Sequence, residues 1–211
     1  MSTGFFIVFE GGEGAGKSTQ VAELARNLRS RGSHVVLTRE PGGVPSAEAI
    51  RSILLDPAND GLTDRAEALL FAAARAEHAA QLIRPALDRG DVVICDRFID
   101  SSVAYQGVAR DLGVDQIADL SAWATEGLLP DLTIVLDIDP VDGLVRAGHT
   151  SATPDRMESE SLSFHERVRQ AFLDRAAASP QRYEVIDATL PADVVAQQVG
   201  RAVTALISRQ R

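Results

Sequence analysis

The chain has 211 residues, of which 45% are hydrophobic and 24% charged, and this composition suits one soluble domain with a full core. Its net charge of −9 argues against a nucleic-acid duplex as a partner, because binding a phosphate backbone needs a basic surface. The single cysteine, Cys95, excludes an intrachain disulfide, and the apolar run at 5–9 is too short for a signal peptide or a membrane span. We therefore expect a cytoplasmic protein with no membrane partner.

Strand and helix signals alternate along the chain. Residues 5–10 (FFIVFE) form a continuous apolar run that ends at two glycines, which is typical of a strand buried on both faces. Further strands are predicted over 34–38, 92–96, 132–137 and 183–186. Helices are predicted over 17–31, 45–55, 64–88 with a kink before Pro85, 114–127, 141–147, 163–178 and 191–209. The alternation predicts a single α/β domain over 1–211, with a five-stranded parallel sheet covered by helices on both faces.

The first predicted strand leads into a phosphate loop. Residues 11–18 (GGEGAGKS) match G-x-x-x-x-G-K-[ST] in full, so the domain is expected to be a P-loop, three-layer α/β/α fold. Glycines allow successive N–H groups to converge on the β-phosphate, and the positive end of the following helix points at the same place. Lys17 would bridge the β- and γ-phosphates, and the Ser18 hydroxyl would ligate Mg²⁺. The residues assigned to ATP here are Gly11, Gly12, Glu13, Gly14, Ala15, Gly16, Lys17, Ser18 and Thr19.

Lys17 is the only lysine in the chain; the other 20 of its 21 basic residues are arginine. A compositional bias toward arginine explains the scarcity of lysine elsewhere. A compact ammonium on a flexible stem suits a phosphate loop, where a planar guanidinium does not.

The third predicted strand ends in Asp96 and Arg97. Ligands of parallel sheets bind at the carboxyl ends of the strands, so both side chains are expected in the phosphate crevice. Asp96 can hold the water shell of Mg²⁺ and Arg97 can grip a phosphate. A local salt bridge between the two residues would explain the pair equally well.

Residues 94–106 (ICDRFIDSSVAYQ) closely resemble the signature of thymidylate kinases, a family of P-loop nucleoside monophosphate kinases. Three further segments resemble that family at matching positions: 38–43 (TREPGG), 71–75 (FAAAR) and 155–158 (DRME). The resemblance extends from about Phe5 to the last helix. It implies transfer of the γ-phosphoryl group of ATP to dTMP to give dTDP, with Mg²⁺ as cofactor, in a protein that is commonly a homodimer.

The resemblance also implies a dTMP site. Its residues would be Glu40, Arg51, Phe71, Arg75, Arg97, Ser102, Tyr105 and Gln106. Phe71 would stack on thymine, and Arg75, Ser102 and Gln106 would reach the base. Tyr105 would crowd the 2′ position of the sugar, Arg51 and Arg97 would grip the acceptor phosphate, and Glu40 and Glu13 would be acids near the metal and the acceptor.

Most of these residues, taken alone, also have a structural explanation. Phe71 and Tyr105 could be packing residues, and Arg75 could form a surface ion pair with Glu67 or Glu77. Ser102 could be a helix N-cap, with Gln106 in solvent. The order and density of the matching segments favour the kinase.

The catalytic arginine is the point at which the sequence departs from the family. Thymidylate kinases supply it from the phosphate loop or from a mobile lid, and Gly14 stands at the loop position, so the lid variety is implied. The predicted lid, 147–158, has no arginine or lysine before Arg156. The catalytic assignment is therefore Lys17, Glu13, Arg97 and Arg156, with Arg146 beside ATP as the alternative source of charge.

Two other functions stay open at this stage. One is a kinase for another nucleoside monophosphate or for a deoxynucleoside. The other is a nucleotide-binding regulatory protein with weakened catalysis, for which the lid without an early arginine is the motive. In the favoured reaction the acceptor is a phosphate that is already anionic near neutral pH. No strong general base is needed, and positioning and charge neutralisation would supply the catalysis.

Overall fold

A computed structural model describes residues 4–148, 157 and 160–209. Its sheet consists of parallel strands in the order β2-β3-β1-β4-β5. The strands are β1 (Phe5–Glu10), β2 (Val35–Arg39), β3 (Val92–Asp96), β4 (Leu132–Asp137) and β5 (Tyr183–Asp187). The predicted five-stranded parallel sheet is confirmed, and each strand lies within a residue or two of its predicted bounds.

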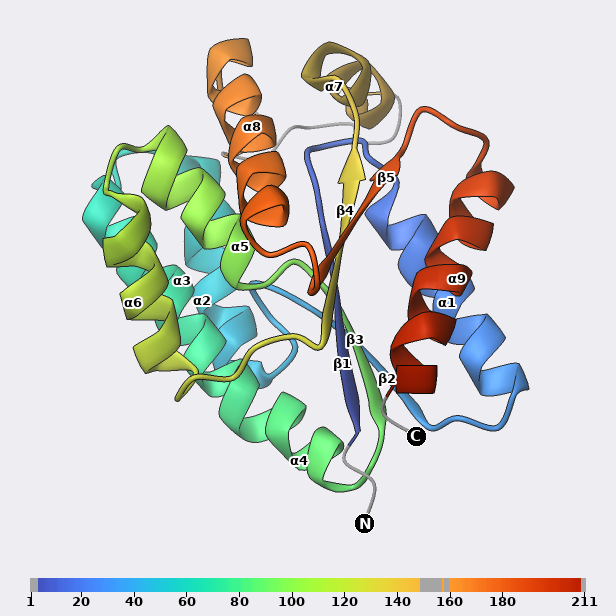
Figure 1. The fold of residues 1–211 in the computed structure, drawn as a ribbon. Helices are drawn as coiled ribbons and strands as arrows, with labels where there is room; N and C mark the ends of the chain where they lie inside the picture. Colours follow the sequence, from blue (N-terminus) through green and yellow to red (C-terminus); the bar gives the residue numbers. More distant parts are fainter. Residues whose placement is uncertain (1–3, 149–156, 158–159, 210–211) are drawn as a thin grey trace.

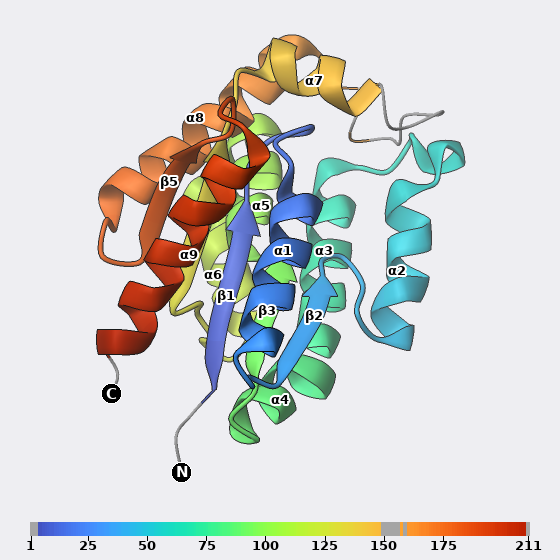
Figure 2. The same cartoon turned by 90° about the vertical axis from the view of Figure 1, so that its right-hand side faces the viewer.

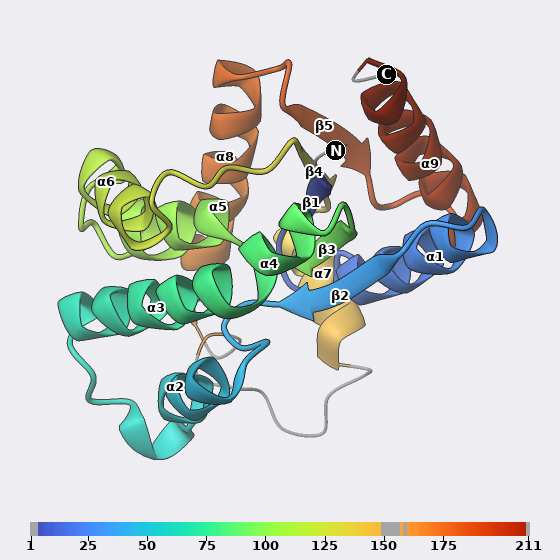
Figure 3. The ribbon, with the colours of Figure 1, turned by 90° about the horizontal axis from the view of Figure 1, so that it is seen from below.

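Helices cover both faces of the sheet, so the predicted three layers are confirmed. On one face lie α1 (Lys17–Ser30) and α9 (Ala192–Arg209), which stand together in Figure 2. On the other lie α3 (Asp64–His78), α5 (Ile99–Ser102) and α8 (Leu162–Ala178), with α2 (Pro45–Leu55) and α6 (Val114–Ala124) outside them. The view from below shows the sheet between these two groups (Figure 3).

The apolar run of β1 is buried because it supplies both cores. Ile7 and Phe9 pack with the apolar faces of α1 and α9. Phe6 and Val8 point the other way and pack with Phe98 and the helices of the opposite layer. Alternate side chains of a strand point to opposite faces, so a strand covered on both sides must be apolar throughout.

The segment 64–88 is helical throughout, as predicted, but it is not one regular α-helix. After α3 comes a π-helical stretch, η2 (Ala79–Ile83), and then α4 (Arg84–Asp88). Pro85 has no N–H group, and its ring clashes with the carbonyl four residues earlier in a regular helix. A wider turn directly before Pro85 accommodates this mismatch.

A second π-helical stretch was not predicted. The chain turns from β3 into α5 and continues as η3 (Val103–Ala109), which is buried along most of its length. α6 also ends three residues before its predicted end, because Glu126 and Gly127 have left-handed backbone angles (φ 50° and 73°) that terminate a helix.

The helix α7 (Pro140–Gly148) lies across the carboxyl end of the sheet, opposite the end at which β1 begins (Figure 1). The short turn η1 (Pro57–Asn59) follows α2. Most of the predicted lid lies outside the described residues, which include only its first two positions and Met157. Within the described part of the chain, no helix has both the length and the apolar composition that crossing a bilayer requires.

Candidate active site

A cavity of about 440 Å³ opens at the carboxyl ends of β1 and β3, a size typical of small-molecule sites. These strands are neighbours in the sheet, and chain connections leave them in opposite directions, which is where parallel sheets bind ligands. Most predicted site residues line this cavity. They are Glu13, Gly14, Ala15, Gly16, Lys17, Ser18, Thr19, Glu40, Arg51, Phe71, Arg75, Asp96, Arg97, Ser102, Tyr105, Gln106 and Arg146.

The phosphate loop connects β1 to α1 and folds back onto its own lysine. Lys17 Nζ donates to the carbonyl oxygens of Gly11, at 3.1 Å, and Gly12, at 2.8 Å. These two glycines therefore contact the lysine and are not among the residues that line the cavity. Burial, with Arg97 nearby, lowers the pKa of Lys17, although Glu13 acts in the opposite direction. Gly16 caps α1 in a left-handed conformation (φ 84°), which a side chain would disfavour.

Gly14 is pressed against α7. A Cβ atom on Gly14 would stand 1.9 Å from the carbonyl oxygen of Gly143, and one on Gly143 would stand 2.3 Å from that of Glu13. Both distances are shorter than any real contact, and the obstructing atoms are backbone. The loop position that could have carried a catalytic arginine is thus occupied by a contact that only glycine permits while α7 stays in place.

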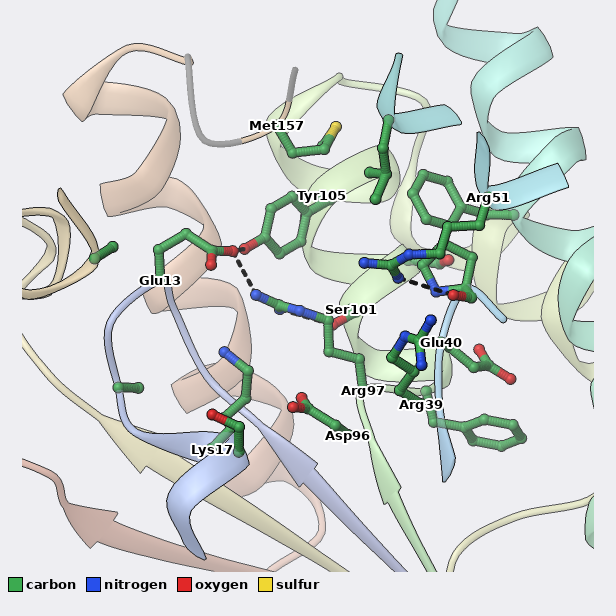
Figure 4. Close-up of a pocket in the computed structure, with 18 of the residues that line it drawn as sticks. Glu13, Lys17, Arg39, Glu40, Arg51, Asp96, Arg97, Ser101, Tyr105 and Met157 are labelled. Carbon is green, nitrogen blue, oxygen red and sulfur yellow. Dashed lines mark hydrogen bonds and ion pairs between the residues drawn. The ribbon is translucent and has the colours of Figure 1, made fainter. Parts of the chain in front are cut away.

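Glu13, Arg97 and Tyr105 form one cluster in the cavity (Figure 4). Arg97 pairs with the Glu13 carboxylate, and the Tyr105 hydroxyl donates to the same carboxylate over 3.1 Å. Arg97 also donates to the Gly11 carbonyl and to the Ser101 hydroxyl, both at 3.2 Å. Burial alone would raise the pKa of Glu13, but Arg97 and Lys17 outweigh it and lower that pKa to about 2. Glu13 is therefore ionised at neutral pH.

Asp96 ends β3 level with Phe9 of β1 and Arg39 of β2. Its Oδ1 is buried and has no hydrogen-bond partner within the described residues, where no ion pair joins Asp96 to Arg97. The local salt bridge considered from the sequence is therefore not formed. A buried carboxylate oxygen without a donor, beside the phosphate loop, fits a site for a hydrated Mg²⁺. The described chain holds no cluster of three or more His, Cys, Asp or Glu that would bind a metal alone.

Arg75 is buried, with 2% of its surface exposed, and its guanidinium contacts three other residues that line the cavity. Its Nε donates to Glu40 over 2.7 Å, and Nη2 donates to the Ser102 hydroxyl over 2.9 Å and to the Phe98 carbonyl over 3.2 Å. Nη1 lies 3.3 Å from the Ser121 hydroxyl. A surface ion pair with Glu67 or Glu77 is therefore the wrong explanation for Arg75. The described contacts of Glu40 are with Arg75 and His78.

The other predicted base residues are also accounted for by contacts. Ser102 receives a hydrogen bond from Arg75 and makes no helix cap. Gln106 is 1% exposed and donates to Glu67, so it is not in solvent. Phe71 is half-buried on α3 and lines the cavity. Arg51 donates to the Pro41 carbonyl over 2.8 Å.

Of the two arginines that flank the predicted lid, the structure describes only one. Arg146 lies at the end of α7, lines the cavity and donates to the Ala188 carbonyl over 2.8 Å. Arg156 lies outside the described residues. Met157, directly after it, is 7% exposed and lines the cavity above Tyr105 (Figure 4).

Sequence reasoning missed Glu10. This carboxylate is fully buried and accepts hydrogen bonds from the backbone N–H groups of Phe98, at 2.8 Å, and Ser101, at 3.1 Å. Its second oxygen accepts from the Ser101 hydroxyl over 2.6 Å. Burial, reinforced by the charge of Asp100, raises its pKa to about 7. The signal in the sequence was an acid at the end of an otherwise apolar run. Sequence reasoning also missed Arg39 and Ser101, which line the cavity.

Comparisons with known proteins agree with this geometry. A family model described as "Thymidylate kinase" matches residues 9–199. Thymidylate kinase from Clavibacter sepedonicus is 50% identical over 206 residues, which cover 98% of this chain and 97% of the relative. Thymidylate kinase from Deinococcus radiodurans is 48% identical, with coverage of 97% and 98%. A crystal structure of thymidylate kinase from Ehrlichia chaffeensis matches with a TM-score of 0.79 and 33% identity, covering 95% of this chain and 99% of that one. The chain belongs to the thymidylate kinase family, phosphotransferases that use ATP to convert dTMP to dTDP.

Proposed function

We propose that this chain phosphorylates dTMP in the cavity between the phosphate loop and the base pocket of Arg75. The observation that supports this most directly is that one cavity joins both parts, with the Glu13–Arg97 ion pair between them. A triphosphate on the loop and a monophosphate nucleotide on the Arg75 side would meet at that pair. Residues 147–158 would close over them as a lid.

On the ATP side, the N–H groups of the loop and the Lys17 ammonium would hold the β- and γ-phosphates. Arg146 would add charge from the end of α7. Ser18 and Asp96 would hold Mg²⁺, because both line the cavity and Asp96 offers a buried oxygen without a donor. The ion, when bound, neutralises the charge of the phosphates.

On the dTMP side, Phe71 would stack on thymine and Arg75 would donate to the base edge. A guanidinium has five N–H donors, and the described contacts of Arg75 use four of them, which leaves one on Nη1. Gln106 and Ser102 complete the base pocket, and Glu40 keeps Arg75 in position. Tyr105 would face the sugar.

Arg97 and Arg51 would hold the acceptor phosphate. Arg97 is already fixed by Glu13, Gly11 and Ser101, so little conformational freedom remains to be lost on binding. Burial alone would lower the pKa of Arg97, but its neighbours Tyr105 and Glu13 outweigh burial and raise that pKa. A guanidinium held in this way approaches the acceptor without reorganisation, which favours in-line transfer.

The substrate is best tested with a panel of nucleotides. ADP release would be followed with dTMP, dUMP, dCMP, dAMP, dGMP and the corresponding nucleosides, with Lys17→Ala as the inactive control. We expect dTMP to be turned over with the highest kcat/KM. Faster turnover of another monophosphate or of a nucleoside would make the chain a different kinase. Binding of ATP and dTMP without any dTDP would make it a nucleotide-binding regulator.

Arg156 is our candidate for the charge that stabilises the transition state. The lid holds no earlier arginine, and α7 leaves no room for one at Gly14. We expect Arg156→Ala to lower kcat by about 10³ with little change in nucleotide binding. Arg167→Ala is the matched control, because Arg167 on α8 is exposed and its described ion pair is with exposed Asp111. Near-normal kcat in Arg156→Ala would remove the assignment.

We further propose that the protein is a cytoplasmic homodimer in which copies pack through α3 and α6. These helices lie side by side and carry exposed apolar side chains, of which Trp123 is 80% and Leu69 59% exposed. An exposed apolar patch of this kind is more often an interface than a solvent-facing surface.

A further inference from the structure

The side-chain amide of Gln106 donates a hydrogen bond to a buried carboxylate. Its Nε2 lies 2.8 Å from Oε1 of Glu67 on α3, and the two residues are 1% and 0% exposed. An ionised carboxylate only accepts hydrogen bonds, so the amide must turn its NH₂ group toward Glu67. The amide oxygen Oε1 then faces away from Glu67 and accepts no hydrogen bond from any described residue. Because Gln106 lines the cavity, this oxygen is the group it offers to a ligand.

Glu67 in turn faces Arg110, the residue that follows η3. Nε and Nη2 of Arg110 each lie 3.4 Å from one oxygen of Glu67. Asp64 is 3.5 Å from the same guanidinium, and Glu160, just before α8, forms a further ion pair with it. The guanidinium also lies over the Phe164 ring, 5.0 Å from its centroid. Arginine has only donors, so both Glu67 oxygens act as acceptors toward Arg110 as well as toward Gln106.

Arg75 and Gln106 therefore offer a fixed pattern to a base. Arg75 has only donors, and Gln106 offers an acceptor. Thymine and uracil carry the complementary pattern, an accepting O4 beside a donating N3–H. Cytosine carries the reverse, a donating amino group beside an accepting N3. At the N3 position, an amide that could rotate would pair with either base, and an amide held by Glu67 pairs only with thymine or uracil.

We propose that Glu67 and Arg110 are positioning residues that set base selectivity by holding the Gln106 amide in one orientation. The inference rests on the proposed function, in which Gln106 contacts the base. Arg110 holds the Glu67 carboxylate in place, and Glu67 fixes the orientation of the Gln106 amide. Neither Glu67 nor Arg110 touches the nucleotide.

The test compares selectivity, measured as the ratio of kcat/KM for dTMP to kcat/KM for dCMP. Glu67→Gln gives Gln106 a partner that can both donate and accept, so the amide can turn over. We expect the ratio to fall by about tenfold or more, because one hydrogen bond of the correct sense is lost for dTMP and one is gained for dCMP. Arg110→Met is expected to lower the ratio in the same direction. Glu77→Gln is the matched control on the same helix, since the described partners of Glu77 are Ser46 and Gln81.

Two further variants test the order of action. The double variant Glu67→Gln/Arg110→Met is expected to show the ratio of Glu67→Gln alone, because Arg110 acts only through Glu67. Arg110→Lys keeps a cation beside Glu67 and is expected to retain most of the wild-type ratio. If Glu67→Gln fails to fold, the comparison of Arg110→Met with Arg110→Lys tests the same inference. Arg110 is 16% exposed, so both substitutions are made at a site that is not fully buried.

A merely structural role would lower kcat/KM for dTMP and dCMP in parallel and leave the ratio unchanged, and that result would overturn the inference. The same conclusion would follow if Arg110→Met and Arg110→Lys had equal ratios. The proposed function is judged separately, on the wild-type enzyme. If wild type itself fails to prefer dTMP, base reading by Gln106 is wrong, whatever the variants do.

Discussion

Glu10 is a buried acid directly before the phosphate loop, and its protonation is linked to the stability of the fold. Burial and the charge of Asp100 raise its pKa from 4.5 to about 7, although Ser101, Arg97 and Phe98 act against the shift. A raised pKa means that the folded state binds the proton more tightly than the unfolded state. The resulting stabilisation is complete below about pH 4.5 and is lost as the pH rises through about 7.

Glu10→Gln should remove this dependence on pH, because an amide does not titrate and can keep the contacts to Phe98 and Ser101. We expect the unfolding free energy of wild type to fall by about 2 kcal/mol more than that of the variant between pH 5 and 8. Urea unfolding at several pH values measures both. Glu23→Gln, at an exposed position of α1, should follow wild type. Equal losses in wild type and Glu10→Gln would contradict the shift.

The site residues that belong to a sequence motif could be predicted. The contacts that a residue makes with a distant part of the chain could not. The phosphate loop and the segment 94–106 supplied most of the predicted residues that line the cavity. For Arg75 the structural alternative named the wrong ion-pair partner, because Glu40 is 35 positions away in the sequence, whereas Glu67 and Glu77 are near in the same helix. The contacts of Glu10 with Phe98 and Ser101 and of Glu67 with Gln106 likewise join distant segments, and no spacing rule reports them.

The helix α7 packs on the phosphate loop through one close contact at a glycine. Its buried Gly143 touches the phosphate loop at Glu13 and Gly14, and both sides of the contact are backbone. The position of α7 is thereby tied to that of the phosphate loop. A shift of α7 away from the loop would move Arg146, which lies on the same helix.

Gly143→Ala should displace α7 from the loop. Its Cβ would stand 2.3 Å from the Glu13 carbonyl, and relieving such an overlap costs about 1–3 kcal/mol. We expect kcat/KM for ATP to fall by about tenfold or more, with a lower melting temperature. Gly200→Ala, in α9, is the control, because a Cβ there also meets no atom within 4 Å. Identical kinetics for the two variants would show that the contact does not position α7.

At the scale of elements, periodicity was sufficient for the strands and for most helices. Strands buried on both faces are short apolar runs with clear ends, as in β1 and β3. The two π-helical stretches could not be predicted from the sequence. A π turn differs from an α turn by one residue in its hydrogen-bond pattern and barely changes the spacing of polar and apolar residues. η3 shows the consequence, since it places Gln106 against Glu67.

For the whole molecule, the alternation of elements indicated parallel strands and three layers but not the order β2-β3-β1-β4-β5. That order brings the loop after β1 next to Asp96, the last residue of β3, and Arg97, which follows it. It therefore decides which motifs form one site. Oligomeric state is also a property of the surface, and core burial explains the apolar faces of α3 and α6 only in part, since Trp123 is 80% exposed.

Trp123→Glu should split the proposed homodimer, because burying a carboxylate in an apolar interface without a partner is strongly unfavourable. In analytical ultracentrifugation, wild type is expected at twice the monomer mass of 22.5 kDa and the variant at the monomer mass. Val185→Glu on β5, at another exposed apolar position, is the control and should remain dimeric. A monomeric wild type would refute the homodimer, and a dimeric Trp123→Glu would place the interface elsewhere.

The single lysine of this chain has a practical consequence for chemical labelling. Apart from the amino terminus, Lys17 is the only amine that an acylating reagent can modify, and it is 8% exposed in the nucleotide cavity. Reagents such as sulfonylfluoride or ester analogues of ATP would therefore modify one side-chain nitrogen, Nζ of Lys17. Coupling through amines to a sensor surface would attach every molecule by the same end, provided that the cavity is filled with nucleotide during the reaction.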